Sequence, residues 1–162
     1  MSYNFIKWAN LQESNTPKTL ELYDLSYGRA SLDPVISKET MDLHFGKLAK
    51  GYVDRYNASE GDPTFNEAGA FLHNILFAQF KEPVAGNLPT GAAKQFIEKW
   101  FKTFDNFKEK FEIEAMKLQG SNWVYLARNG EIKTIKNHET RSDIVLLIDW
   151  WEHAFLLDLK VT

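Results

Sequence analysis

The sequence predicts an α+β fold: an N-terminal helical hairpin followed by a lobe of helices on a small three-stranded antiparallel sheet. Two helical segments with apolar residues spaced by three and four come first, and a proline- and glycine-rich linker follows them. Short strand-like segments then flank an Asn-Gly pair, which is typical of a hairpin. With 162 residues, 44% of them hydrophobic, the chain can form one domain or two small lobes that share a core. We expect an N-terminal extension over 1–22, a helical-hairpin lobe over 23–82 and an α/β lobe over 83–162.

The first helix is predicted over residues 38–57. Ser37 is a good N-cap, and Glu39 places a negative charge in the first turn. The apolar face of this helix consists of Met41, His44, Phe45, Leu48, Tyr52 and Tyr56. His44 is therefore expected to point inward from an otherwise apolar surface.

A second helix is predicted over about 65–81, and it is apolar nearly all round, which is typical of a buried helix. The segment "KEPVAGNLPTG" follows and is expected to link the two lobes. Two amphipathic helices, over about 91–104 and 105–118, open the second lobe.

The segment "NWVYLARNGEIKTIK" predicts a β-hairpin whose central residues, Asn129 and Gly130, both adopt positive φ. The apolar run "DIVLLID" predicts a third strand that is buried on both faces and ends at Asp149. A short helix or turn over "WWEHAFLLDL" is expected to follow it.

Composition excludes several classes of function. The net charge of −3, without a block of lysine or arginine, argues against nucleic-acid binding. No apolar run approaches the roughly 18 residues that a membrane span needs, and no secretory signal is visible. The absence of cysteine excludes disulfides and thiolate metal sites, so any metal must be held by His, Asp or Glu. We expect a cytoplasmic protein without membrane or nucleic-acid partners.

The stretch "IDWWEHA" places Asp149 and His153 four positions apart among large aromatics. A buried charge needs a partner, because its transfer out of water is costly. One interpretation is that these side chains, with His44, are core residues satisfied by backbone groups. The other is a metal site, since two histidines and one carboxylate form the ligand set of non-haem iron and also suit manganese.

At these residues the chain resembles the iron/manganese superoxide dismutase family, which has D-x-W-E-H-A at its C-terminal ligand pair. The resemblance continues, in the family's order over about 23–159, through "LDPVISKETMDLHFGKLAKGYV", "FNEAG", "NLPTG", "FDNFKEKF" and "GSNWVYL". It implies one ion of iron or manganese. The implied reaction converts superoxide to dioxygen and hydrogen peroxide.

The resemblance also implies roles for individual residues. His44 corresponds to the first metal ligand, Asp149 to the third and His153 to the fourth. Tyr52 corresponds to the catalytic tyrosine at the substrate funnel. His138 falls near a second catalytic position, where the family bonds the metal's solvent.

Three further residues carry implied roles around this site. Trp123 and Trp151 correspond to parts of its aromatic wall. Glu152 corresponds to the residue that reaches a partner subunit's ligand, so a homo-oligomer is expected.

The second ligand departs from the family pattern. The family has Asn-His in its second helix, whereas "LHNILF" places His73 before Asn74. Alignment on "FN" upstream and "LF" downstream puts Asn74 at the ligand position, and a regular helix turns His73 about 100° away from it. A one-residue π-bulge in this helix would bring His73 into the ligand set. We expect a regular helix, with three protein ligands and neither residue essential for the metal.

Other departures bear on activity. Leu48, Ala70, Ala78 and Leu156 stand where the family has polar or aromatic residues around the site, and the C-terminal part of the family pattern is shortened. Hydrogen bonds around a metal site often matter by about 10- to 100-fold. The first hypothesis is therefore a superoxide dismutase of impaired activity. The alternative is a degenerate dismutase fold that serves as a structural or assembly subunit and docks onto partner chains.

Overall fold

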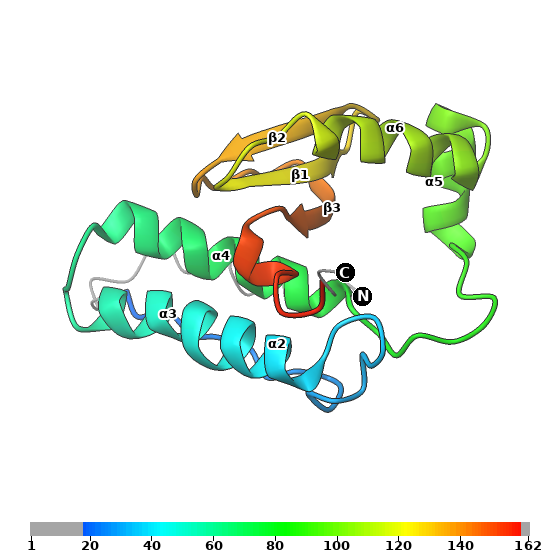
Figure 1. Cartoon of the computed structure of the whole chain (residues 1–162). Helices are drawn as coiled ribbons and strands as arrows, with labels where there is room; N and C mark the ends of the chain where they lie inside the picture. Colours follow the sequence, from blue (N-terminus) through cyan, green and yellow to red (C-terminus); the bar gives the residue numbers. More distant parts are fainter. Residues whose placement is uncertain (1–17, 160–162) are drawn as a thin grey trace.

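The computed structural model describes residues 18–159 and confirms the predicted α+β architecture. A helical hairpin forms one layer, and a three-stranded sheet with two further helices forms the other (Figure 1). A short C-terminal turn, red in Figure 1, lies between the two layers. Of the N-terminal extension expected over 1–22, residues 1–17 lie outside the described part.

The first arm of the hairpin is one continuous helical run made of α2 (Lys38–Leu43), η2 (His44–Ala49) and α3 (Lys50–Asn57). Its extent matches the predicted helix, and the predicted cap is confirmed, because the Ser37 hydroxyl accepts a hydrogen bond from the Thr40 N–H at 3.1 Å.

The middle segment, η2, is a π-helix that begins at His44. No π-helical turn is predicted in the first helix, so η2 is a difference from the prediction. The wider turn shifts the buried stripe: Ala49 is fully buried, whereas the expected Leu48 is only half-buried. Such turns are frequent at functional sites.

The second arm, α4 (Pro63–Gln79), is a regular α-helix. It begins two residues before the predicted start because the Asp62 carboxylate accepts from the Phe65 N–H at 3.0 Å, and Pro63 suits the first turn. It has 17 residues, and no helix among the described residues is long and apolar enough to cross a membrane.

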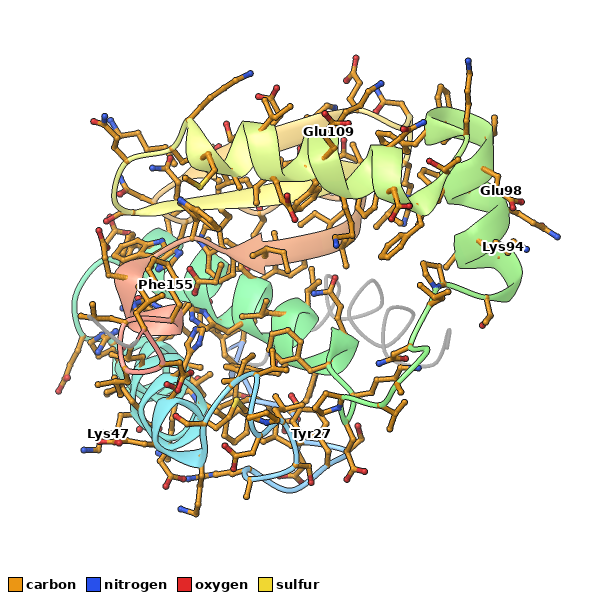
Figure 2. All side chains as sticks on the ribbon, turned by 45° about the vertical axis from the view of Figure 1, so that its right-hand side comes forward. Tyr27, Lys47, Lys94, Glu98, Glu109 and Phe155 are labelled. Atoms are coloured by element: carbon orange, nitrogen blue, oxygen red, sulfur yellow. The ribbon has the colours of Figure 1, made fainter. Side chains whose placement is uncertain are left out.

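Two helices open the second lobe, α5 (Gly91–Phe101) and α6 (Phe104–Met116). The break between them comes earlier than predicted because Lys102 adopts a φ of 71° and Thr103 caps α6. In Figure 2, Lys94 and Glu98 project outward from α5, where they pair at 3.7 Å.

The sheet has the order β2-β1-β3 and is antiparallel throughout, with β1 at Asn122–Ala127, β2 at Ile132–Lys136 and β3 at Ile144–Asp149. The predicted hairpin is confirmed, but its turn differs. The Gly130 N–H donates to the Ala127 carbonyl, and Gly130 alone of the two central residues has positive φ, at 81°. A three-residue loop with a glycine at its left-handed position therefore replaces the expected two-residue turn.

The expectation that the third strand is buried on both faces is wrong, because β3 is an edge strand and Val145 is 44% exposed. One core cluster, which contains Leu72, Leu76 and Leu147, lies between α4 and the sheet. A second, which contains Phe107, covers the other face under α6. Asp149, at the end of β3, thus arrives at the junction of the sheet with the helical hairpin.

Candidate metal centre

Four potential ligands meet where the two layers join, and each comes from a different element. His44 opens η2, His73 lies in α4, Asp149 ends β3, and His153 lies in the 3₁₀ turn η3 (Glu152–Ala154). One ligand atom from each residue lies within 4.8 Å of all the others, so the group could hold a metal ion. His44, His73 and Asp149 are buried, and His153 is partly buried.

The Asp149 carboxylate is the centre of the group. Its Oδ2 lies 3.0 Å from His44 Nε2 and 3.1 Å from His153 Nε2. Its Oδ1 accepts a hydrogen bond from the Trp151 N–H at 2.9 Å. This backbone bond fixes the carboxylate so that one oxygen faces the imidazoles.

In the second helix, α4, the structure confirms the regular helix but turns His73, not Asn74, toward the other candidate ligands. His73 Nε2 lies 3.7 Å from Asp149 Oδ2, although α4 contains no bulge. Asn74 faces away and holds the N-terminal segment: its Oδ1 accepts from the Tyr23 N–H at 2.9 Å, and its Nδ2 donates to the Glu21 carbonyl at 2.8 Å. Alignment on the flanking motifs directed Asn74 toward the site, whereas the structure directs His73 there.

The hydrogen bonding of His73 shows whether an ion would fit this site. Its Nδ1–H donates to the Gly69 carbonyl at 2.7 Å, which leaves Nε2 with a free lone pair. Nε2 is buried without a hydrogen-bond partner, a costly arrangement for a polar atom unless a further group satisfies it. Burial first, and then His44 nearby, lower the pKa of His73 to about 3, so the ring is neutral.

The pKa shifts of His44 and Asp149 agree with metal binding. Burial lowers the pKa of His44, although the contact with Asp149 opposes this shift. Burial alone would raise the pKa of Asp149, but the contacts with His153 and His44 outweigh it and hold that pKa well below its usual range. An ionised carboxylate beside neutral imidazoles is the form that metal ligands must take.

The spacing of the ligand atoms also suits one shared ion. Bonds from such ions to nitrogen or oxygen are about 2.0–2.2 Å long, so adjacent ligand atoms lie roughly 3–3.7 Å apart around the ion. The contacts of 3.0, 3.1 and 3.7 Å to Asp149 Oδ2 fall in that range. Three imidazoles and one carboxylate suit iron or manganese.

Tyr52 and His138, the two predicted catalytic residues, lie together beside this cluster. The Trp123 Nε1–H donates to His138 Nδ1 at 3.1 Å, so the proton of His138 is on Nε2, which donates to the Tyr52 hydroxyl at 3.0 Å. The Tyr52 ring centroid is 5.3 Å from that of His73. Burial lowers the pKa of His138 to about 4, so this ring is neutral as well.

Gly69 is a site residue that sequence reasoning missed. A Cβ at this position would lie 2.8 Å from Tyr52 Cγ, so only glycine lets the tyrosine ring approach α4 this closely. Its carbonyl also orients His73. The available signal was a glycine inside a buried helix, which usually marks a close approach.

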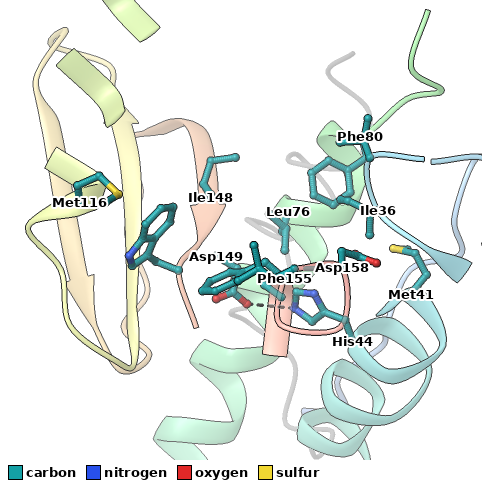
Figure 3. A pocket seen from close by; sticks show the side chains of 14 residues that line it. Ile36, Met41, His44, Leu76, Phe80, Met116, Ile148, Asp149, Phe155 and Asp158 are labelled. Carbon is teal, nitrogen blue, oxygen red and sulfur yellow. Dashed lines mark hydrogen bonds and ion pairs between the residues drawn. The ribbon is translucent and has the colours of Figure 1, made fainter. Parts of the chain in front are cut away.

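An apolar cavity of about 810 Å³ borders the cluster (Figure 3). His44 and Asp149 form part of its wall, and Leu76, Phe80 and Phe155 supply apolar wall. Phe155 belongs to the C-terminal turn, which Figure 2 shows beside the helical hairpin. The candidate ligands thus adjoin both the hydrogen-bonded pair of Tyr52 and His138 and an apolar cavity.

The fold and the four convergent side chains define a class: a protein with a candidate mononuclear centre of three histidines and one aspartate, placed between a helical hairpin and an α/β lobe. Two family models match the chain. The alpha-hairpin domain of iron/manganese superoxide dismutases matches residues 19–68, and the C-terminal domain of the same family matches residues 89–162. The chain belongs to the iron/manganese superoxide dismutase family.

Individual relatives carry both metals in their names. The chain is 38% identical to the superoxide dismutase [Mn/Fe] of Porphyromonas gingivalis, in an alignment that covers 86% of each chain. It is 33% identical to the superoxide dismutase [Fe] of Bacteroides fragilis, over 88% of each chain. It is also 33% identical to the superoxide dismutase [Mn] of Listeria innocua, over 88% of this chain and 86% of that relative.

Proposed function

We propose that this chain is a metal-dependent superoxide dismutase in which His44, His73, Asp149 and His153 hold one ion of iron or manganese. The observation that carries the proposal is the buried, unpaired Nε2 of His73, which lies 3.7 Å from Asp149 Oδ2. When bound, such an ion supplies two neighbouring oxidation states, so that one superoxide is oxidised to dioxygen and a second, with two protons, is reduced to hydrogen peroxide.

The chain's own residues prepare the site for this substrate. Asp149 contributes one negative charge and the neutral imidazoles none, so a bound divalent or trivalent ion leaves a net positive charge that attracts an anion. Burial raises the pKa of Tyr52, which keeps its hydroxyl protonated near neutral pH. Because the Tyr52 oxygen accepts from His138, its own hydrogen remains available to a group in the site.

We also propose that two copies of the chain associate near η3. Glu152 is exposed and directly precedes the partly buried His153, so a second copy that contacts this turn would lie close to the ligand set. The resemblance to the family supports this arrangement, in which Glu152 reaches a ligand of the partner subunit.

The expectation of impaired activity has less support, because His73 lies among the other three candidate ligands and could serve as the fourth. The substitutions at Leu48, Ala70, Ala78 and Leu156 remain its basis. The structural-subunit alternative rests on the same substitutions, and the ligand geometry favours the enzyme.

Metal analysis together with a superoxide-consumption assay tests the proposal. Protein purified without added ions is expected to retain iron or manganese, up to one ion per chain, and to consume superoxide. Asp149→Ala serves as the control that removes the central carboxylate, and it should lose both properties. A wild-type protein that binds neither metal, even after loading, would favour the structural-subunit alternative.

A further inference from the structure

Gln79 joins two elements that carry candidate ligands. Its Oε1 accepts from the Leu147 N–H at 2.8 Å, and its Nε2 donates to the Leu147 carbonyl at 2.9 Å. The same Nε2 lies 3.4 Å from the Leu76 carbonyl. Because β3 is an edge strand, the side-chain amide of Gln79 takes the place that a neighbouring strand would occupy.

The position of this pair relates it to the metal centre. Gln79 is the last residue of α4, the helix that carries His73. Leu147 lies two residues before Asp149, so their side chains point to the same face of β3, and both are buried. The Gln79 pair therefore links the backbone next to Asp149 to the helix of His73.

The other two imidazoles are hydrogen-bonded to Asp149, whereas that of His73 is not. His44 and His153 lie within hydrogen-bond distance of Asp149 Oδ2. The Nε2 of His73 is 3.7 Å away, and the only side-chain hydrogen bond that His73 makes among the described residues is from Nδ1 to the Gly69 carbonyl of its own helix. The distance between His73 and Asp149 must therefore be set by how α4 lies on β3.

Apolar packing alone sets that placement loosely. Burial of Leu72 and Leu76 against Leu147 is favourable but not directional, so it tolerates small sliding movements. A shift of one strand residue is about 3.3 Å, enough to take His73 away from a shared ion. Two short hydrogen bonds between one amide and one backbone residue permit a single register.

We infer that Gln79 is a positioning residue for the metal centre. Through its two hydrogen bonds to Leu147 it holds His73 of α4 at the distance from Asp149 that lets both bind the same ion. This inference rests on the proposed metal site. It differs from a general stabilising role, because its effect on metal binding is transmitted through His73.

The chain offers a matched control in Asn57. Its Oδ1 accepts from the Leu20 N–H at 2.8 Å and its Nδ2 donates to the Leu20 carbonyl at 2.9 Å. The same pair of hydrogen bonds thus occurs where no candidate ligand depends on it. Gln79→Met and Asn57→Leu each remove one such pair of hydrogen bonds and keep the approximate size of the side chain. Gln79→Glu is a second variant, which keeps the acceptor for the Leu147 N–H and loses the donor.

The experiment is a double-mutant cycle in the full chain, with Mn²⁺ as the probe and two readouts: the dissociation constant and the electron paramagnetic resonance spectrum of the bound ion. Gln79→Met is expected to weaken Mn²⁺ binding by about tenfold or more and to change the spectrum. Gln79→Glu should act in the same direction. Asn57→Leu should stay within about twofold of wild type. In a His73→Ala background, Gln79→Met should have almost no further effect, because the residue it positions is gone.

Each other outcome overturns the inference. If the wild type and both Gln79 variants had equal Mn²⁺ affinity and equal spectra, the hydrogen bonds from Gln79 to Leu147 would not position His73. An equal factor of weakening with and without His73 would show a general structural effect. Failure of the wild type itself to bind Mn²⁺ would instead refute the proposed metal site, and this inference with it.

Discussion

Gly69→Ala tests whether the approach of Tyr52 to α4 shapes the site. The added Cβ would lie 2.8 Å from Tyr52 Cγ, whereas ordinary contact begins at 3.4 Å, so the ring must move by about 0.6 Å. The hydrogen bond from His138 to the Tyr52 hydroxyl is 3.0 Å long, and a displacement of that size away from His138 would break it.

The energetic effects have opposite signs. Overpacking costs about 1–3 kcal/mol, and loss of a hydrogen bond costs about 1 kcal/mol. Alanine in a helix interior contributes about 1 kcal/mol of stabilisation relative to glycine. We therefore expect a net loss of about 1–3 kcal/mol, or about 2–4 °C in Tm for each kcal/mol, and reduced superoxide consumption.

Gly51→Ala is the matched control. It is also a helical glycine, but its Cβ would meet only the Arg55 side chain, at 3.0 Å, which can move away. That variant should gain about 0.5–1 kcal/mol and keep full activity. Thermal unfolding and the superoxide assay compare the two. If Gly69→Ala raised Tm as much as Gly51→Ala and kept its activity, the argument from close approach would be wrong.

Further predictions concern the ligands and the response to pH. His73→Ala should bind metal more weakly than the wild type and retain less of it after purification, as His153→Ala should, measured by elemental analysis; retention of metal at the wild-type level would remove His73 from the ligand set. Asn74→Ala should keep its metal but unfold at a lower temperature, since it loses two hydrogen bonds to the N-terminal segment; metal loss there would contradict the structure. The pKa of His138 is about 4 in the fold, below the ordinary value near 6.5, so its unfolded form takes up the proton first as pH falls. Metal-free protein should therefore lose stability from about pH 6.5 down to pH 4, and His138→Gln should show a shallower loss in urea titrations at pH 7.5 and 5; equal slopes would count against this assignment.

Much of the fold could be predicted from the sequence because local signals agreed with the final packing. The spacing of apolar residues located the helical run over 38–57, and Ser37 marked its start. The edge position of β3 could not be predicted. A run of apolar residues indicates a buried strand, but it does not show whether a neighbouring strand or a helix buries it. The turn at Asn129 differed because dipeptide preference does not determine loop length.

The candidate site was predicted unevenly. The motif "DWWEHA" located Asp149 and His153, and the apolar face of the first helix located His44. His73 was assigned the wrong phase, because one residue of uncertainty in an alignment corresponds to about 100° on a helix. Contacts that settle the phase, such as that of Asn74 with Tyr23, join residues 51 positions apart, and no local pattern reveals them.

The origin of the four ligands has a consequence for how metal enters and leaves. His44 and His73 belong to the helical hairpin, and Asp149 and His153 to the α/β lobe. An ion bound by all four would therefore connect the two lobes. We expect the site to form when the lobes close and the ion to leave when they open. A chelator should therefore act only on molecules that have already opened, and the rate of metal loss should level off as chelator concentration rises. That plateau would measure how often the two lobes separate.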